Sequence, residues 1–403
     1  MIKTADPAEP VQATSPTPSR IVENARAMVP HLRARIAETE RLRKLPEETM
    51  KEAAEAGIFS LFVPKSLGGA GGGVGDFVEM VKALAQGHLS AAWTLAFLAE
   101  HGLMLARYPE EAQKEIFAEG SDALMSGVIH PPGTAVPVEG GYEVSGYWGY
   151  ATAVQHADWV QVFAKVEGRE GETLLTLLKR EDVEVVETWD MSGMGGTGSH
   201  HVRTEGAFVP EYRTLDMDVW SSRGNPGAFL HPEAVYSYAL RDVLGFMYPA
   251  MAVGAAESII ADYRQRLENR RAPFSSLITA DSVGGQMRYA RCIQALRLAQ
   301  ATLKQTVDEV VEANATIEGE FPPEMRASVK LGLMGVLRMA WEAVDLAVKG
   351  SGTSVFKNDH PMQYYIRDLE MLLSHQTIDE DAMLGMTGQI LLGRATQSTI
   401  SII

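Results

Sequence analysis

Residues 141–154 read GYEVSGYWGYATAV, and residues 158–166 read DWVQVFAKV. The apolar residues in both stretches recur with a period close to two, which is typical of half-buried β-strands. The runs TLLTLLK at 173–179 and VEVVETW at 183–189 continue this pattern, and glycine-rich clusters such as EGREGE and SGMGGTG provide turns. The sequence therefore predicts a small antiparallel β-barrel or sandwich between residues 124 and 228.

The segments on both sides of this β region have the apolar spacing of amphipathic helices, three and four residues apart. The pattern covers residues 76–106 before it and the long runs 287–315 and 325–350 after it. Runs of that length exceed ordinary helices and predict a bundle. We therefore expect an α+β multidomain fold. Its parts are a disordered tail (1–19), an N-terminal helical domain (20–123), the central β domain (124–228) and a C-terminal four-helix bundle (229–403).

Composition narrows the classes of function. The chain of 403 residues has 36 Lys and Arg against 52 Asp and Glu, a formal net charge of −16, which disfavours binding to nucleic acid or to an anionic membrane. The single cysteine, Cys292, excludes an intrachain disulfide or a multi-thiolate metal site. The polar N-terminus lacks the apolar run of a signal peptide, and the apolar run at 243–256 is shorter than a membrane span. We expect a cytoplasmic protein.

The glycines in residues 193–198, GMGGTG, match the G-x-G-x-x-G pattern of dinucleotide-binding loops. Such a site needs a helix after the glycines, whereas the next residues, HHVRTEGAFV, have the period of a strand. The glycines are therefore expected to form a tight turn whose backbone amides can approach a ligand. No H-x-x-x-H, H-E-x-x-H or G-x-S-x-G pattern occurs, so we expect neither a metal site nor a serine hydrolase.

Two isolated histidines, His101 and His375, lie in apolar helical runs. A lone histidine in that setting is more often a hydrogen-bonded core residue than a group that takes part in chemistry. The residues alone leave both interpretations open.

Four stretches in the same order resemble landmarks of the acyl-CoA dehydrogenase fold. They are LFVPKSLGG (61–69), GYEVSGYWGYATAVQHADWV (141–160), GMGGTGSHHV (193–202) followed by GAFVPEYRT, and KGSGTSVFKNDHPMQYYIRDLEMLLSH (349–375). A dehydrogenase of this fold needs a carboxylate base shortly after the Arg-Asp helix, and this chain has Ser374-His375-Gln376 there. The chain instead resembles the flavin-dependent monooxygenases of the fold. These are oxygenase components of two-component systems such as hydroxyphenylacetate hydroxylase, indole oxygenase and dibenzothiophene monooxygenase.

The resemblance implies an oxygenase that uses reduced flavin (FADH2 or FMNH2) and O2, through a C4a-hydroperoxyflavin, to hydroxylate or epoxidise a small phenol- or indole-like aromatic. It implies that His375 stabilises the peroxide, because a histidine can donate a proton where a carboxylate would repel the anion. His101 is then expected to orient or deprotonate the substrate. Trp93 and Ser126 join His101 as expected substrate contacts, although Trp93 is equally well explained as a core residue.

The same resemblance implies which residues hold the flavin. Near the ring we expect Ser126, Val128, Ala151 and Thr152, although a single Thr in a strand is also explained by β-propensity. Ser199, which follows the glycine turn, is expected to reach the flavin phosphate or the substrate. From a neighbouring subunit we expect Arg271 for the pyrophosphate, since a guanidinium binds phosphate oxygens with two donors, and Phe274 for the ring. The second loop expected from across the boundary is Gly350, Ser351, Gly352 and Thr353. A homotetramer and a separate NAD(P)H:flavin reductase are implied.

Two departures from the family pattern bear on the identity of the substrate more than on the type of reaction. Gly195 stands where many relatives carry Arg, and Ala151-Thr152-Ala153 replaces a Ser-Gly pair. Two alternatives remain. If the chain is an acyl-CoA dehydrogenase or oxidase, acyl-CoA would bleach its bound flavin. If it is a non-catalytic helical scaffold, it would bind no flavin.

Overall fold

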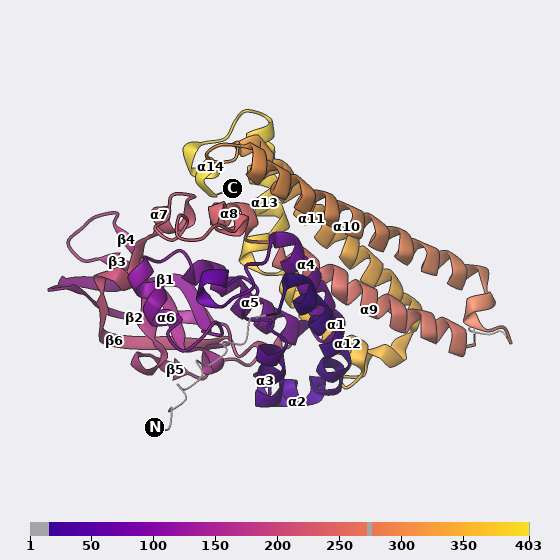
Figure 1. Cartoon of the computed structure of the whole chain (residues 1–403). Coiled ribbons are helices and arrows are strands. Elements are labelled where there is room, and N and C mark those ends of the chain that lie inside the picture. Colours follow the sequence, from indigo (N-terminus) through magenta and orange to yellow (C-terminus); the bar gives the residue numbers. More distant parts are fainter. Residues whose placement is uncertain (1–15, 272–275, 403) are drawn as a thin grey trace, which may run out of the picture.

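The computed structural model describes residues 16–271 and 276–402. Along the sequence a β domain stands between two helical regions, and in Figure 1 it lies at the left with the long helices to its right. The N-terminal helices are α1 (Pro18–Ala34), α2 (Ile36–Leu42), α3 (Glu47–Glu55), α4 (Val74–Gly87), α5 (Leu89–Leu105) and α6 (Glu110–Ile116). Most of the expected tail, residues 1–15, lies outside the described residues. Helix α1 starts at Pro18, so its first two residues fall within the expected tail, and Thr17 accepts a capping hydrogen bond from the Arg20 amide.

The β domain is one seven-stranded sheet in the order β5-β6-β2-β1-β3-β4-β7. Its strands are β1 (Met125–Val138), β2 (Gly141–Ala151), β3 (Trp159–Val166), β4 (Thr173–Lys179), β5 (Glu184–Val186), β6 (His200–Pro210) and β7 (Thr214–Asp216). The expected all-antiparallel pairing is wrong at one place, because β1 and β3 are parallel. The short helix η2 (Val154–His156) carries the chain back to the start of β1, where Asp158 accepts a hydrogen bond from the Leu124 amide.

The C-terminal region is helical and is dominated by three long helices that lie side by side in Figure 1. Its helices are α7 (Met217–Ser221), α8 (Leu240–Val243), α9 (Met247–Asn269), α10 (Val283–Thr316), α11 (Pro323–Ser351), α12 (Pro361–Leu373), α13 (Glu380–Leu391) and α14 (Gln397–Ile402). The expected loop at 350–353 is partly wrong, because Gly350 and Ser351 form the last turn of α11. The helix ends at Gly352, whose positive φ of 77° suits a residue without a side chain.

Helix α5 joins these regions. Every residue of α5 except Phe97 is buried, and the helix contacts α4, α9, α12 and β1. One apolar core runs through the N-terminal helices and the C-terminal helices, while a second core fills the sheet. Helix α5 therefore carries side chains to the place where the β domain meets the bundle.

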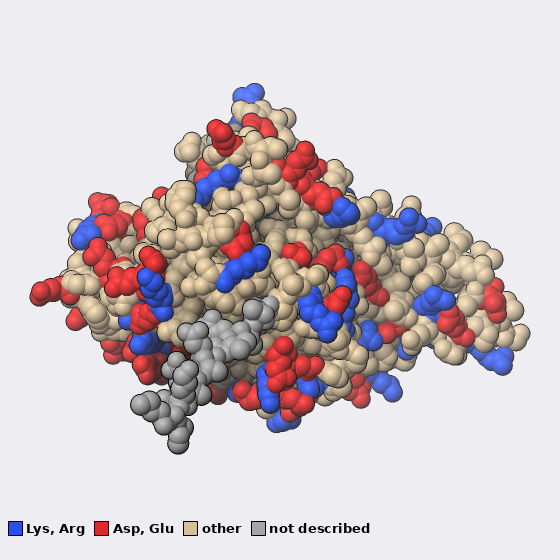
Figure 2. Space-filling model, in the orientation of Figure 1, with Lys and Arg blue, Asp and Glu red and all other residues tan. Residues whose placement is uncertain are grey.

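The surface fits the acidic composition. Figure 2 shows acidic side chains gathered over the β domain on the left of this face, with fewer basic groups between them. One segment, Leu240–Asn269, has the length and apolar character of a membrane-crossing helix; 78% of its apolar window is buried inside the protein, as in the core helix of a globular fold.

Candidate active site

A cluster of aromatic rings lies at the junction of α5, α9 and the end of α12. Trp93, Phe97 and His101 follow one another at four-residue intervals on α5, which places them on one face of the helix. The ring centroids of Trp93 and Phe97 are 6.5 Å apart, and those of Phe97 and His101 are 4.0 Å apart. Two of the expected site residues, Trp93 and His101, thus belong to one continuous wall.

His375 reaches the same cluster from the turn after α12. Its ring lies 5.4 Å from Trp93 and 5.5 Å from Tyr248, a residue of the first turn of α9 whose ring is 5.6 Å from Trp93. The structure therefore brings His375 together with Trp93 and His101, which lie far from it in the sequence. Phe97 and Tyr248 were missed. The spacing of Phe97 from Trp93 could have revealed it, whereas Tyr248 gives no local signal.

Hydroxyl groups from the β domain border this aromatic wall. The indole Nε1 of Trp93 donates to Thr152 Oγ1 over 3.3 Å, and Thr152 Oγ1 lies 2.8 Å from Ser199 Oγ. Ser199 Oγ is in turn 2.8 Å from Thr197 Oγ1, and Ser126 Oγ donates to the Thr152 carbonyl over 2.7 Å. Hydroxyls both donate and accept, so this chain of polar groups matches the alternating donors and acceptors of a flavin ring edge.

The remaining residues expected near the flavin ring lie in the same strands. Val128 is buried in β1, two residues after Ser126, and Ala151 is the buried last residue of β2 and pairs with His200 of β6. The β domain thus places its expected flavin residues around one corner of the sheet.

The hydrogen bond of His101 shows which ring nitrogen carries the proton in the neutral imidazole. Its Nδ1 lies 2.6 Å from the carbonyl oxygen of Met125, so this nitrogen carries the proton and donates. Burial lowers the pKa of His101 to about 4, although the bond to Met125 opposes the shift. The Nε2 atom therefore keeps its lone pair. It lies near Gly127, where an added Cβ would be 3.6 Å from Nε2 and 3.1 Å from Cε1.

His375 has the opposite arrangement. Its Nδ1 accepts from the Thr377 amide over 3.4 Å and lies 2.8 Å from the Thr377 hydroxyl, which leaves the ring proton on Nε2. Burial lowers the pKa of His375 from its usual value, so the neutral form with a donating Nε2 is favoured. The site thus contains one imidazole able to accept a proton and another able to donate a hydrogen bond.

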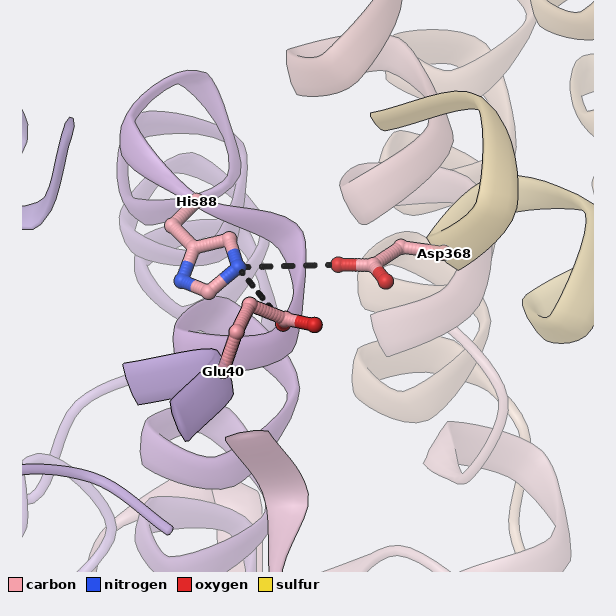
Figure 3. A group of neighbouring side chains, drawn as sticks. All are labelled: Glu40, His88 and Asp368. Carbon is pink, nitrogen blue, oxygen red and sulfur yellow. Dashed lines mark ion pairs between the residues drawn. The ribbon is translucent and has the colours of Figure 1, made fainter. Parts of the chain in front are cut away.

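Glu40, His88 and Asp368 lie together (Figure 3); His88 and Asp368 are buried and Glu40 is half-buried. Glu40 also lies against Gly195 of the glycine turn 193–198. His88 Nε2 is 3.6 Å from Glu40 Oε1 and 3.7 Å from Asp368 Oδ2, and the His88 side chain is 1% exposed. The three side chains have the composition of a metal site, so the expected absence of a metal stays a prediction. Sequence reasoning missed this group because its members come from three distant segments.

Asp368 fixes the glycine turn to the helices. Its Oδ1 accepts from the Met194 amide over 2.6 Å and its Oδ2 accepts from the Ser90 amide over 3.1 Å. The Ser90 hydroxyl accepts from the Gly196 amide over 3.3 Å. Burial raises the pKa of Asp368 to about 6, opposed by His88. These contacts hold the turn that leads to Thr197 and Ser199, so we call them the Asp368 clamp.

The residues expected to bind the flavin phosphates lie elsewhere in this chain. Arg271 is exposed at the tip of the α9 and α10 helices, at the opposite end of the molecule from the β domain in Figure 1, and donates to the Ser276 carbonyl. Ser351, at the same end of the bundle, accepts from Arg270 over 2.7 Å. Gly352 lies against Arg270, and Thr353 begins the short helix η8 (Thr353–Phe356). Phe274 lies outside the described residues.

Comparison with known proteins identifies the family. The chain matches the model of the acyl-CoA dehydrogenase N-terminal domain over residues 16–120 and the model of the acyl-CoA dehydrogenase C-terminal domain over residues 246–380. The chain belongs to the acyl-CoA dehydrogenase family. Within that family it groups with the oxygenase components of flavin-dependent monooxygenases, as its relatives show.

The chain is 28% identical to the flavin-dependent monooxygenase, oxygenase subunit HsaA, of Rhodococcus jostii (strain RHA1), over 90% of this chain and 95% of that protein. It is 25% identical to p-hydroxyphenylacetate 3-hydroxylase, oxygenase component, of Acinetobacter baumannii, over 94% and 90%. The crystal structure of 3-HSA hydroxylase from Rhodococcus sp. RHA1 superposes with a TM-score of 0.87 at 26% identity, covering 94% of this chain and 98% of that one. These matches confirm the expected fold.

The buried state of His101 predicts a pH dependence of stability. Because folding lowers its pKa from 6.5 to about 4, His101 contributes stability that is fully present above pH 6.5 and is lost as the pH falls through 4. We expect the free energy of unfolding of His101→Asn to depend less on pH over this interval, by about 3 kcal/mol. Urea unfolding at a series of pH values measures this difference, and parallel curves for the two proteins would contradict it.

The Asp368 clamp predicts an effect on flavin binding. Asp368→Asn replaces one accepting oxygen by a donor that faces a backbone amide, so the glycine turn should loosen and reduced-flavin affinity should fall roughly tenfold or more. The control is Asp308→Asn, which removes an exposed carboxylate of α10. Anaerobic fluorescence titration gives both dissociation constants, and equal values would show that the clamp does not support the flavin site.

Proposed function

We propose that the chain catalyses monooxygenation of a small aromatic compound with reduced flavin and O2. The observation that carries this proposal is the pair of histidines on one aromatic wall, where His101 presents a lone pair and His375 presents an N–H. Bound reduced flavin would supply the electrons that activate O2 for transfer of one oxygen atom. The protein's own groups then orient the substrate, move its proton and exclude water.

The β domain provides the support for the flavin ring. Thr152 and Ser199 would meet its polar edge, and Ser126, Val128 and Ala151 would line the strands around it. The donor set fits a flavin because hydroxyls can face both its carbonyl oxygens and its N–H groups. Trp93, already bonded to Thr152, would separate this edge from the substrate.

We assign separate roles to the two histidines. His375 Nε2–H would donate a hydrogen bond to the oxygen that bound reduced flavin activates, which would oppose the loss of that oxygen as H2O2. His101 Nε2 accepts a hydrogen bond from a substrate hydroxyl or ring N–H, which orients the substrate and makes its aromatic carbon more nucleophilic. The aromatic rings between the histidines exclude water from the reacting atoms.

The assembly follows from the distance between the two halves of the flavin site. In one chain, the end of the bundle where α9 meets α10 lies away from the β domain (Figure 1). Arg271 follows α9 at that end, Ser351 and Gly352 lie against Arg270, and Thr152 follows β2 in the β domain. A second copy is therefore needed to bring phosphate ligands to the β-domain site, and we propose a homotetramer. A separate NAD(P)H:flavin reductase would supply the reduced flavin, and we infer a cytoplasmic location.

A dehydrogenase is the second candidate, and one observation favours it. Glu100 lies on α5 next to the aromatic wall and brings a buried carboxyl to the site. If Glu100 removed an α-proton from an acyl-CoA, bound oxidised flavin would be bleached by acyl-CoA under anaerobic conditions. The oxygenase proposal predicts no bleaching.

The role of His375 predicts uncoupling. His375→Ala removes the Nε2–H donor, so we expect flavin to reoxidise faster and H2O2 to rise at the expense of hydroxylated product. His375→Asn restores a side-chain N–H and should recover part of the coupling. The test measures the amounts of hydroxylated product and of H2O2 formed per reduced flavin consumed. An unchanged ratio in His375→Ala would remove His375 from the mechanism.

The role of Arg271 predicts weaker binding across the subunit boundary. Arg271→Ala removes a charge-assisted phosphate contact, so reduced-flavin affinity should fall by roughly 1.5 to 3 kcal/mol. The exposed Arg20→Ala on α1 is the control. Anaerobic titration measures the affinities, and light scattering reports whether each protein keeps its oligomeric state. An unaltered affinity in an intact oligomer would show that Arg271 does not hold the phosphate.

A further inference from the structure

Glu100 is a buried carboxyl on the face of α5 that forms the aromatic wall. Residues 93, 97, 100 and 104 are separated by four, three and four positions, which keeps them in one stripe of a helix. Trp93 and Phe97 of this stripe contact each other, and Trp93 also contacts Tyr248 and His375. Glu100 therefore belongs to the same stripe as the residues that line the site.

This carboxyl has no partner within the described residues. Glu100 is 8% exposed, and no hydrogen bond or ion pair joins its side chain to any part of the chain that the structure describes. Burial alone raises its pKa to about 8, and no Lys or Arg opposes the shift. An unpaired buried carboxyl is costly in a folded protein, so a ligand that pairs with it would remove that cost.

The surroundings indicate which ligand would pair with it. Trp93, Phe97 and Tyr248 present aromatic rings within one cluster, and Glu100 acts on Tyr248 as a nearby charge. A carboxyl beside aromatic faces is the arrangement that binds an ammonium group, through a charge-assisted hydrogen bond and cation–π attraction. A substrate with a carboxylate would instead meet a second acid without a compensating cation.

We propose that Glu100 recognises a positively charged nitrogen on the aromatic substrate, so that the substrates of this enzyme are phenols or indoles that carry an alkylammonium group. The inference rests on the proposed function, because it places the substrate between the two histidines of the same site. It also separates this chain from its relative named for p-hydroxyphenylacetate, which carries a negative charge. The ammonium group displaces the proton of Glu100, and the carboxylate that remains pairs with it.

Isothermal titration calorimetry of the full-length protein tests the proposal with three phenols of similar size. Tyramine carries an ammonium group, 4-ethylphenol is uncharged, and 4-hydroxyphenylacetate carries a carboxylate; tryptamine extends the test to an indole. We expect the ammonium compounds to bind at least roughly tenfold more tightly than 4-ethylphenol, and the carboxylate to bind most weakly. Equal affinities, tighter binding of the carboxylate, or no binding of either amine would overturn the proposal.

Proton release provides a second readout. At pH 7 most of Glu100 is protonated, so amine binding should release close to one proton, which titrations in buffers of different ionisation enthalpy measure. Amine affinity should rise with pH up to about 8 and then level off. Glu100→Gln should lose both the amine preference and the proton release, while the exposed Glu312→Gln on α10 should keep both. Proton release that persists in Glu100→Gln would assign the effect to another group.

A measurement on the unaltered protein separates this inference from the proposed function. If reduced flavin reoxidises in the protein as it does in free solution, the oxygenase proposal fails. If the protein delays reoxidation but shows no preference for amines, the oxygenase proposal stands and the assignment of Glu100 fails.

Discussion

The Asp368 clamp is the constraint on which the rest of the site depends. One buried carboxylate accepts the amide of Met194 in the glycine turn and the amide of Ser90 at the start of α5. It thereby joins α12, α5 and the β domain at a single point. The hydroxyls of Thr197 and Ser199 follow the clamped turn, and the aromatic wall is part of the clamped helix. A single carboxylate thus ties the turn that leads to Thr197 and Ser199 to the helix that carries the aromatic wall.

The same region holds the two histidines to which we assign different roles, and their hydrogen bonds differ. His101 donates a hydrogen bond from Nδ1 to a carbonyl oxygen of β1. His375 instead accepts a hydrogen bond at Nδ1 from a backbone amide. Each ring therefore shows the other nitrogen to the site, one as an acceptor and one as a donor. Burial holds both rings neutral by lowering their pKa values, so these roles do not change near neutral pH.

The sequence predicted features that are local or that follow one element. It predicted the order of helices, strands and helices, and it selected both histidines and the hydroxyls of Thr152 and Ser199. It missed features that depend on where distant segments meet. The parallel pairing of β1 with β3 depends on the return path of the chain, and the clamp joins Ser90 to Asp368 across 278 positions. Residue type alone also could not distinguish the unpaired Glu100 from an ordinary surface carboxylate, since only burial shows the difference.

The most direct test of the central claim is a stopped-flow measurement of how the protein handles reduced flavin and O2. Reduced FMN or FAD is bound to the protein without oxygen, mixed with oxygenated buffer and followed from the near ultraviolet to the visible. An oxygenase predicts an absorbance phase in the near ultraviolet that precedes the return of oxidised flavin, and an aromatic substrate should shorten it. Direct reoxidation at the rate of free flavin, with no earlier phase, would contradict the account.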